Sequence, residues 1–211
     1  PAREVRPPAG TRLLARIDGP EDDAVTFGLA CGAPLAVQGA VPWNDIGVVY
    51  GDYLDRMRSL REDWGVTNAE DWLVTMNSLL GEEGGGTRAT LVLALRHEEA
   101  RRTGERVGPV RWRATIEAWC RDNGVAPDPL LELAQTIARY EERFRADGLL
   151  ASGGEVHSVA AYDFGRAVHM ARWGREAHFC DQATAERLVI SAGEGCRRHY
   201  DSWAALSAGY A

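Results

Sequence analysis

The sequence contains no lysine, because all 24 of its basic residues are arginine. A guanidinium group keeps its proton in a protein, so arginine cannot replace lysine in Schiff-base catalysis. The absence therefore excludes Schiff-base chemistry and any phosphate site that depends on a lysine ammonium group.

Cysteine is also scarce, and its positions are widely spaced. The four cysteines are Cys31, Cys120, Cys180 and Cys196, with no C-x-x-C pair among them. In a chain of this length, scattered cysteines are typical of reduced core residues rather than of a disulfide framework. The cysteine pattern therefore predicts a cytoplasmic protein.

Long hydrophobic runs and excess positive charge are missing as well. No apolar stretch approaches the roughly 20 residues that a membrane-spanning helix needs, and no signal peptide is visible. The net charge of −7 is the opposite of the basic footprint that nucleic acids attract. We therefore expect neither a membrane nor a nucleic acid as partner, which leaves another protein. The sequence does not indicate the oligomeric state.

Strand-like alternation is nearly absent, whereas helical spacing of apolar residues recurs along the chain. In the segment 67–81, Thr67 and Glu70 have the spacing of a capping box, Trp72 begins an apolar stripe, and Gly81 ends the helix. Similar patterns cover 50–65, 87–104, 110–124 and 127–148, and two C-terminal helices begin after the expected caps Ser158 and Asp181. The sequence therefore predicts an all-α protein of six to seven helices, packed orthogonally or as a bundle around a central C-terminal helix.

The organisation of the chain follows from its proline, glycine and charge pattern. Residues 1–19 are expected to form a flexible or extended arm, and residues 20–211 a single all-α domain. The glycine-rich break near 81–87 leaves two lobes as an alternative. Residues 34–51 are expected to be mostly loop. The second half of 87–104 is dominated by charged side chains and is expected to project into solvent.

Two segments resemble a known family. The stretch "DWGVTNAEDWLVTMNSLL" and the closing pattern "A-x-D-x-x-R … R-W-G … S-W … Y" are similar to those of a bacterial domain of unknown function, number 1266. The closing pattern consists here of Asp163, Arg166, Arg172, Trp173, Gly174, Ser202, Trp203 and Tyr210. The resemblance covers roughly residues 20–211, with a poorly matched middle. It implies an all-α fold and no particular activity.

The helix that begins after Ser158 carries polar residues on an otherwise apolar or small surface. Asp163 and Arg166 are three residues apart, so their side chains can form an ion pair on one helix face, and Tyr162, His169 and Trp173 lie near them. One interpretation is a polar centre that binds a ligand or catalyses a reaction. The other is a structural pair that links the two family-like segments, with Trp64 or Trp72 against Trp173 or Trp203.

Four residues near the C-terminus are candidate metal ligands. His178 and Cys180 are followed by Cys196 and His199, which offer nitrogen and sulfur ligands of the kind that zinc prefers. Their spacing is that of no recognised zinc motif. The sequence therefore predicts no metal and no cofactor, and it also lacks the G-x-S-x-G signature of a serine nucleophile.

Two functions from different classes remain open. The first is a non-catalytic protein-interaction module, either an adaptor or an immunity-type protein that neutralises a partner. The second is a small enzyme or ligand-binding protein that uses Asp163, Arg166 and His169. The first is favoured because no group of residues has the composition of an active site.

Overall fold

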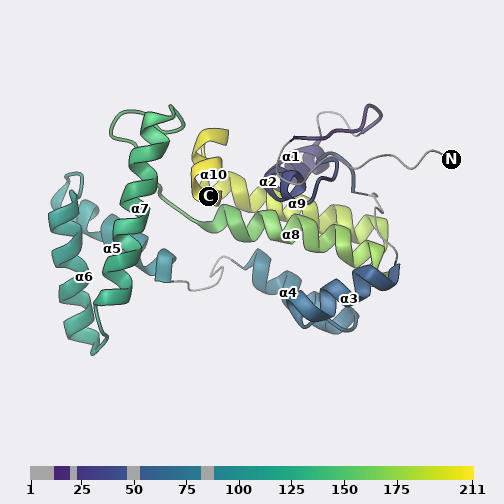
Figure 1. Ribbon diagram of the computed structural model, residues 1–211, viewed down its shortest axis with the longest axis horizontal. Coiled ribbons are helices and arrows are strands. Elements are labelled where there is room, and N and C mark those ends of the chain that lie inside the picture. Colours follow the sequence, from purple (N-terminus) through teal and green to yellow (C-terminus); the bar gives the residue numbers. More distant parts are fainter. Residues whose placement is uncertain (1–11, 20–22, 47–52, 82–87) are drawn as a thin grey trace. The chain divides into compact units, whose positions relative to one another are not determined.

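The computed structural model describes residues 12–19, 23–46, 53–81 and 88–211 of the chain. These residues form ten α-helices and no β-strand, and their one bridge joins Leu14 to Pro42 (Figure 1). The predicted all-α fold is confirmed. Within the same residues, no helix has the length and apolar character needed to cross a bilayer. The expected arm falls mostly on residues 1–11, and the expected break on 82–87, both of which lie outside the described residues.

The described helices belong to two compact units. Unit 1 contains α1 (Ala24–Cys31), α2 (Ala33–Gln38), α3 (Tyr53–Trp64), α4 (Ala69–Leu80), α8 (Ala160–Glu176) and α9 (Gln182–His199). Unit 2 contains α5 (Arg88–Thr103), α6 (Pro109–Asn123), α7 (Asp128–Ala146) and α10 (Trp203–Tyr210). Each unit therefore joins stretches of chain that are distant in sequence.

The helix count exceeds the expected six to seven partly because of a short helix in the segment expected to be loop. Residues 33–38 form α2, which has Pro34 in its first turn and ends at Gly39. Proline is compatible with the first turn of a helix, because the amide hydrogen it lacks has no intrahelical acceptor there. The prediction of loop from the density of proline and glycine was wrong at this point.

The start of α4 differs by one residue from the sequence prediction, whereas the predicted cap of α9 is confirmed. The N-cap of α4 is Asn68 rather than Thr67, and its side chain accepts hydrogen bonds from the amides of Glu70 and Asp71, at 2.8 and 3.0 Å. Thr67 instead donates its hydroxyl to the Asp71 carboxylate, at 2.6 Å. The predicted capping box between Thr67 and Glu70 is therefore wrong, although the helix it announced is present. At α9, the predicted cap Asp181 does accept from the amide of Thr184.

In unit 1, α8 is buried on nearly all sides, with 12 of its 17 residues buried. Glycines allow the helices of unit 1 to approach each other closely, α4 to α8 at Gly174 and α1 to α9 at Gly28. A Cβ atom at Gly174 would lie 2.3 Å from the indole of Trp72, and one at Gly28 would lie 2.2 Å from the carbonyl oxygen of Val189. The indole nitrogen of Trp72 donates to the carbonyl of Met170, at 2.9 Å, which fixes α4 on α8.

Unit 2 is a three-helix core of α5, α6 and α7, to which α10 adds Ala208. Its centre consists of Val92, Leu93, Trp112, Ile116, Leu130 and Leu131. The indole nitrogen of Trp112 donates to the carbonyl of Val92, at 3.0 Å, so the largest core side chain of α6 is bonded to α5. A buried indole N–H needs such an acceptor, because an unpaired donor in the core is costly.

Candidate functional site

The first polar group on α8 is an ion pair between Asp163 and Arg166. Asp163 is buried, and one of its carboxylate oxygens accepts a hydrogen bond from the Arg166 guanidinium. The guanidinium carbon lies 4.5 Å from the ring centroid of Tyr162 and 5.4 Å from that of Trp64. The pairing expected from the three-residue spacing is present, and Arg166 also contacts α3 through Trp64.

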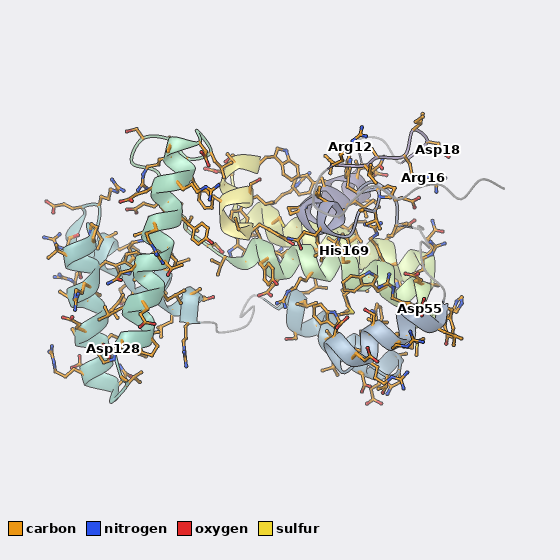
Figure 2. All side chains as sticks on the ribbon, in the orientation of Figure 1. Arg12, Arg16, Asp18, Asp55, Asp128 and His169 are labelled. Carbon is orange, nitrogen blue, oxygen red and sulfur yellow. The ribbon has the colours of Figure 1, made fainter. Side chains whose placement is uncertain are left out.

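His169 lies midway along α8 and is buried (Figure 2). Its Nε2 atom is 3.0 Å from the carbonyl oxygen of Gly32. Burial, and then the positive charge of Arg172, lower the pKa of His169 to about 3. The ring is therefore neutral near pH 7, and because its partner is an acceptor, Nε2 carries the proton and donates it to Gly32. This donor therefore links α8 to Gly32, the C-cap of α1.

Further along α8, two charged residues also bind the unit's own chain. Arg172 donates from Nη2 to the carbonyl oxygen of Pro42, at 2.9 Å. Glu176 is buried and accepts from Nε of Arg56 on α3, at 2.7 Å. Arg56 and Glu176 were not identified from the sequence. The sequence signal for Glu176 was its spacing from Arg172, because residues four apart lie one turn apart on one face of a helix.

Aromatic rings join the two family-like segments. The ring centroid of Trp173 lies 6.0 Å from that of Trp64 and 5.6 Å from that of His169. The guanidinium carbon of Arg56 lies 5.2 Å from the Trp173 centroid. The predicted contact of Trp64 with Trp173 is confirmed. Trp203, the alternative to Trp173 in that prediction, is 51% exposed at the first position of α10.

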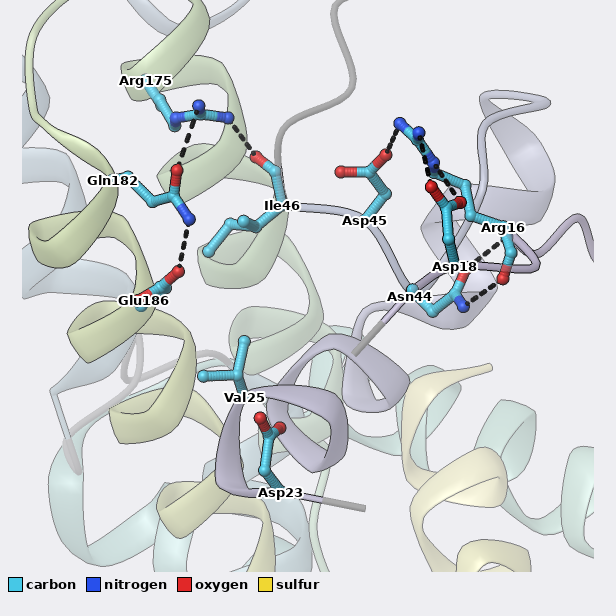
Figure 3. A pocket seen from close by; sticks show the side chains of 11 residues that line it. Arg16, Asp18, Asp23, Val25, Asn44, Asp45, Ile46, Arg175, Gln182 and Glu186 are labelled. Carbon is cyan, nitrogen blue, oxygen red and sulfur yellow. Dashed lines mark hydrogen bonds and ion pairs between the residues drawn. The ribbon is translucent and has the colours of Figure 1, made fainter. Parts of the chain in front are cut away.

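A polar cavity of about 370 Å³ lies elsewhere in unit 1 (Figure 3). Its lining consists of Arg16, Asp18, Gly19, Asp23, Val25, Asn44, Asp45, Ile46, Arg175, Gln182 and Glu186. Arg16 forms an ion pair with Asp45 at 2.6 Å, whereas Arg175 donates to the backbone carbonyl of Ile46 at 3.4 Å. Neither this cavity nor a second one between α6 and α7 is lined by Asp163, Arg166 or His169.

The four candidate metal ligands have separate surroundings. His178 is stacked near Tyr53, and His199 lies beside Phe164, with ring centroids 5.4 and 5.7 Å apart. Cys196 is buried, and its pKa is raised by a hydrogen bond with the Cys31 thiol and by burial, whereas burial raises the pKa of Cys180 to about 11. Nowhere in the described part of the chain do three or more histidine, cysteine or acidic side chains gather around one point.

Unit 2 contains a buried ion pair that the sequence did not reveal. Arg96 is 2% exposed and contacts both carboxylate oxygens of Glu141, at 2.8 and 3.2 Å. It also donates to the carbonyl of Val156, at 2.6 Å, and stacks over Trp112, with 4.3 Å from guanidinium carbon to ring centroid. The charged half of α5 was expected to project into solvent, and this is wrong at Arg96. The missed signal was its position four residues after the core residue Val92.

Beside this ion pair, two imidazole rings face each other. Nε2 of His97 on α5 lies 3.4 Å from Nδ1 of His157 in the loop before α8, and the ring centroids are 5.4 Å apart. Burial, and then the neighbouring His157, lower the pKa of His97. Glu155 in the same loop accepts from Nε of Arg106, at 2.7 Å.

The fold and these sites define an all-helical protein whose buried charged groups bind each other and the backbone. The sequence model of the family described as "Protein of unknown function (DUF1266)" matches residues 59–211, and the chain belongs to this family. The match starts later than the expected residue 20. Searches among curated proteins and among solved structures found no match to the chain.

Proposed function

We propose that the protein is a non-catalytic protein-interaction module, of the adaptor or immunity type. The proposal rests on one observation: the polar side chains at the centre of α8 are already bound to partners within unit 1. Asp163 binds Arg166, His169 binds a backbone carbonyl of the α1–α2 junction, and Arg172 binds another before α3. These groups stabilise unit 1, and a catalytic acid or base would instead need access to a substrate.

The surface of unit 1 supports the same proposal. On α4, Leu73 and Val74 are adjacent and are 48% and 64% exposed. On α3, Tyr53 and Leu54 are 43% and 64% exposed. Exposed apolar side chains that are adjacent on a helix are candidates for contacts with another protein. The outer surface of α4 is therefore the place where we expect a partner to bind.

Photo-cross-linking in the source cells tests this surface. A photoreactive amino acid replaces Leu73 in one variant and the exposed Arg143 of α7 in a control variant. We expect the variant at position 73 to form one cross-linked product, whereas the control variant does not. Val74→Glu should abolish that product without changing the melting temperature, because Val74 is exposed. Equal products at both positions would contradict the proposal.

Arg166→Met separates the structural role of the polar centre from a role in ligand binding. The substitution keeps the length of the side chain but removes its charge. As an interaction module, the variant should melt at a lower or unchanged temperature and still form the cross-link from position 73. If it stays folded but no longer binds the partner, Asp163, Arg166 and His169 are a functional site and the alternative of a ligand-binding protein or enzyme replaces this proposal.

A further inference from the structure

We propose that the polar cavity of unit 1 binds a primary alkylammonium ion, that is, a protonated amine on a short aliphatic chain. The volume of the cavity, about 370 Å³, lies in the range of small-molecule sites, about 300–1,000 Å³. Its walls come from the starts of α1 and α9, the end of α8 and the segments 16–19 and 44–46 (Figure 3). The fold of unit 1 therefore builds the cavity from several distant parts of the chain.

The charge of the lining favours a cation. Four carboxylates (−4) and two guanidinium groups (+2) line the cavity, so its formal charge is −2. The starts of α1 and α9 each add roughly half a positive charge from the helix dipole. The sum of about −1 is balanced by one monovalent cation. The charged residues are Asp18, Asp23, Asp45, Glu186, Arg16 and Arg175.

The two arginines of the lining are bound to other groups of the protein. The Arg16 guanidinium lies 2.6 Å from the carboxylate of Asp45 and 3.3 Å from that of Asp18. Arg175 donates to the backbone carbonyl of Ile46 at 3.4 Å. Of the four carboxylates in this described lining, two therefore have no arginine partner.

These two carboxylates, Asp23 and Glu186, accept hydrogen bonds from neutral donors. The amide of Thr26 donates to Oδ1 of Asp23 at 2.7 Å, and the side-chain amide of Gln182 donates to Oε1 of Glu186 at 2.8 Å. The hydrogen bonds from Thr26 lower the pKa of Asp23, so this carboxylate is ionised near pH 7. A carboxylate can accept about four hydrogen bonds. Both groups therefore keep acceptor capacity for a bound donor.

The existing hydrogen bonds favour an ammonium over a guanidinium group. A guanidinium binds a carboxylate best through two parallel hydrogen bonds, one to each oxygen. In both Asp23 and Glu186, one oxygen already accepts from the protein. An ammonium carries three donors on one nitrogen and needs only one oxygen from each carboxylate. The chain contains no lysine, so none of its own side chains can supply the ammonium.

Two apolar side chains of the cavity, Val25 and Ile46, offer contacts for the aliphatic part of the ligand. In Figure 3 they lie between Glu186 on one side and Asp45 on the other. Both are only partly buried, so a bound alkyl chain would remove more of their surface from water. Each CH₂ group buried in this way strengthens binding by about fourfold.

Calorimetric titration of the full-length chain with n-butylammonium tests the chemistry of the site. We expect one ion bound per chain. Two matched compounds, 1-butanol without charge and tetramethylammonium without N–H donors, should bind at least about tenfold more weakly. Butylguanidinium should also bind more weakly than butylammonium. Equal binding of tetramethylammonium would reduce the effect to general charge attraction and overturn the proposal, as would tighter binding of butylguanidinium.

Two variants test the assigned carboxylates. Asp23→Asn and Glu186→Gln each remove one negative charge but keep an oxygen for the existing hydrogen bond, and asparagine caps helices as well as aspartate does. Each should weaken butylammonium binding at least about tenfold, with little change in melting temperature. The matched control is Asp181→Asn, because Asp181 caps α9 through the same type of bond, to Thr184, but does not line the cavity. It should bind butylammonium as the native chain does.

The ammonium could come from a free amine or from a lysine of another protein, and a blocked Gly-Lys-Gly peptide distinguishes the two sources. Tighter binding of butylammonium than of the peptide supports a free amine, whereas tighter binding of the peptide supports a lysine side chain. The proposal is overturned if neither compound binds saturably, or if binding survives both Asp23→Asn and Glu186→Gln. An equal loss in Asp181→Asn would also overturn it, because that residue lies outside the lining. None of these results depends on the exposed surface of α4.

Discussion

At the residue scale, His169 makes the stability of unit 1 dependent on acid. Its pKa is lowered from 6.5 to about 3, so the unfolded chain takes up a proton in this interval and the folded chain does not. The free energy of unfolding therefore falls as the pH drops from about 6.5 toward about 3. At about 1.4 kcal/mol per unit of pKa difference, the loss reaches about 3 kcal/mol near pH 4.5.

His169→Gln should flatten this pH dependence. Glutamine retains an N–H that can donate to the Gly32 carbonyl but has no proton to gain. Urea unfolding of both proteins between pH 7 and pH 4.5 measures the difference in slope. An unchanged slope in the variant would mean that other groups cause the acid sensitivity.

The second residue-scale prediction concerns Arg96 and Glu141. Arg96→Met leaves the Glu141 carboxylate buried without its cation, which should lower the free energy of unfolding by about 3–5 kcal/mol. The double variant Arg96→Met/Glu141→Leu should recover part of this loss, because no buried charge then remains. The control is Arg101→Met on the exposed side of α5, which should change stability by less than about 0.5 kcal/mol. Denaturant midpoints measure all three, and no recovery in the double variant would refute the explanation.

The sequence predicted the interactions of some of these residues but not of others. The pairing of Asp163 with Arg166 is local, so helix spacing predicted it. The partner of His169 is 137 positions away along the chain, and no local pattern encodes such a contact. Arg96 was missed for another reason, since four charged residues that follow it obscured its place on the apolar stripe of α5.

At the scale of elements, the sequence predicted where the helices lie along the chain, but not how closely one helix approaches another. The apolar stripe of α4 announced the helix, but nothing in its pattern revealed that Trp72 occupies the space left by Gly174 on α8. A missing side chain gives no periodic signal. The same holds for α1 and α9, where Gly28 lies against the backbone of Val189.

Gly174→Ala should therefore destabilise unit 1 by about 1–3 kcal/mol, the usual cost of overpacking a core. The new methyl group would displace the Trp72 indole and break its hydrogen bond to Met170. The matched control is Gly108→Ala, because a Cβ there would meet no atom within 4 Å. Thermal melting followed by circular dichroism compares the two, and equal melting temperatures would show that α4 can shift without cost.

At the scale of the whole molecule, the family match does not coincide with a unit. It begins at residue 59, within α3, whereas unit 1 also includes α1 and α2. These two helices supply the buried side chains of Leu29, Cys31 and Ala36. Helix α1 ends beside Gly32, whose carbonyl oxygen accepts the hydrogen bond from His169. The matched segment alone therefore lacks part of the core that it needs.

A fragment consisting of residues 59–211 should leave the apolar surface of α9 uncovered. We expect it to bind a hydrophobic dye and to melt at a lower temperature, with less cooperativity, than the full chain. Gly28→Val, which keeps every residue but prevents α1 from approaching Val189, should produce a weaker form of the same defect. A fragment that melts like the full chain would show that α1 and α2 are dispensable.

The discontinuity of unit 1 also has a consequence during synthesis. The stretch 86–160 is translated between α4 and the helices α8 and α9 that complete the unit. At about 5–20 residues per second, this interval lasts roughly 4–15 s. Throughout it, the nascent α1 and α4 lack the surfaces on which Gly28 and Trp72 come to lie. Slow codons within this interval should therefore lower the yield of folded protein while leaving its amino-acid sequence unchanged.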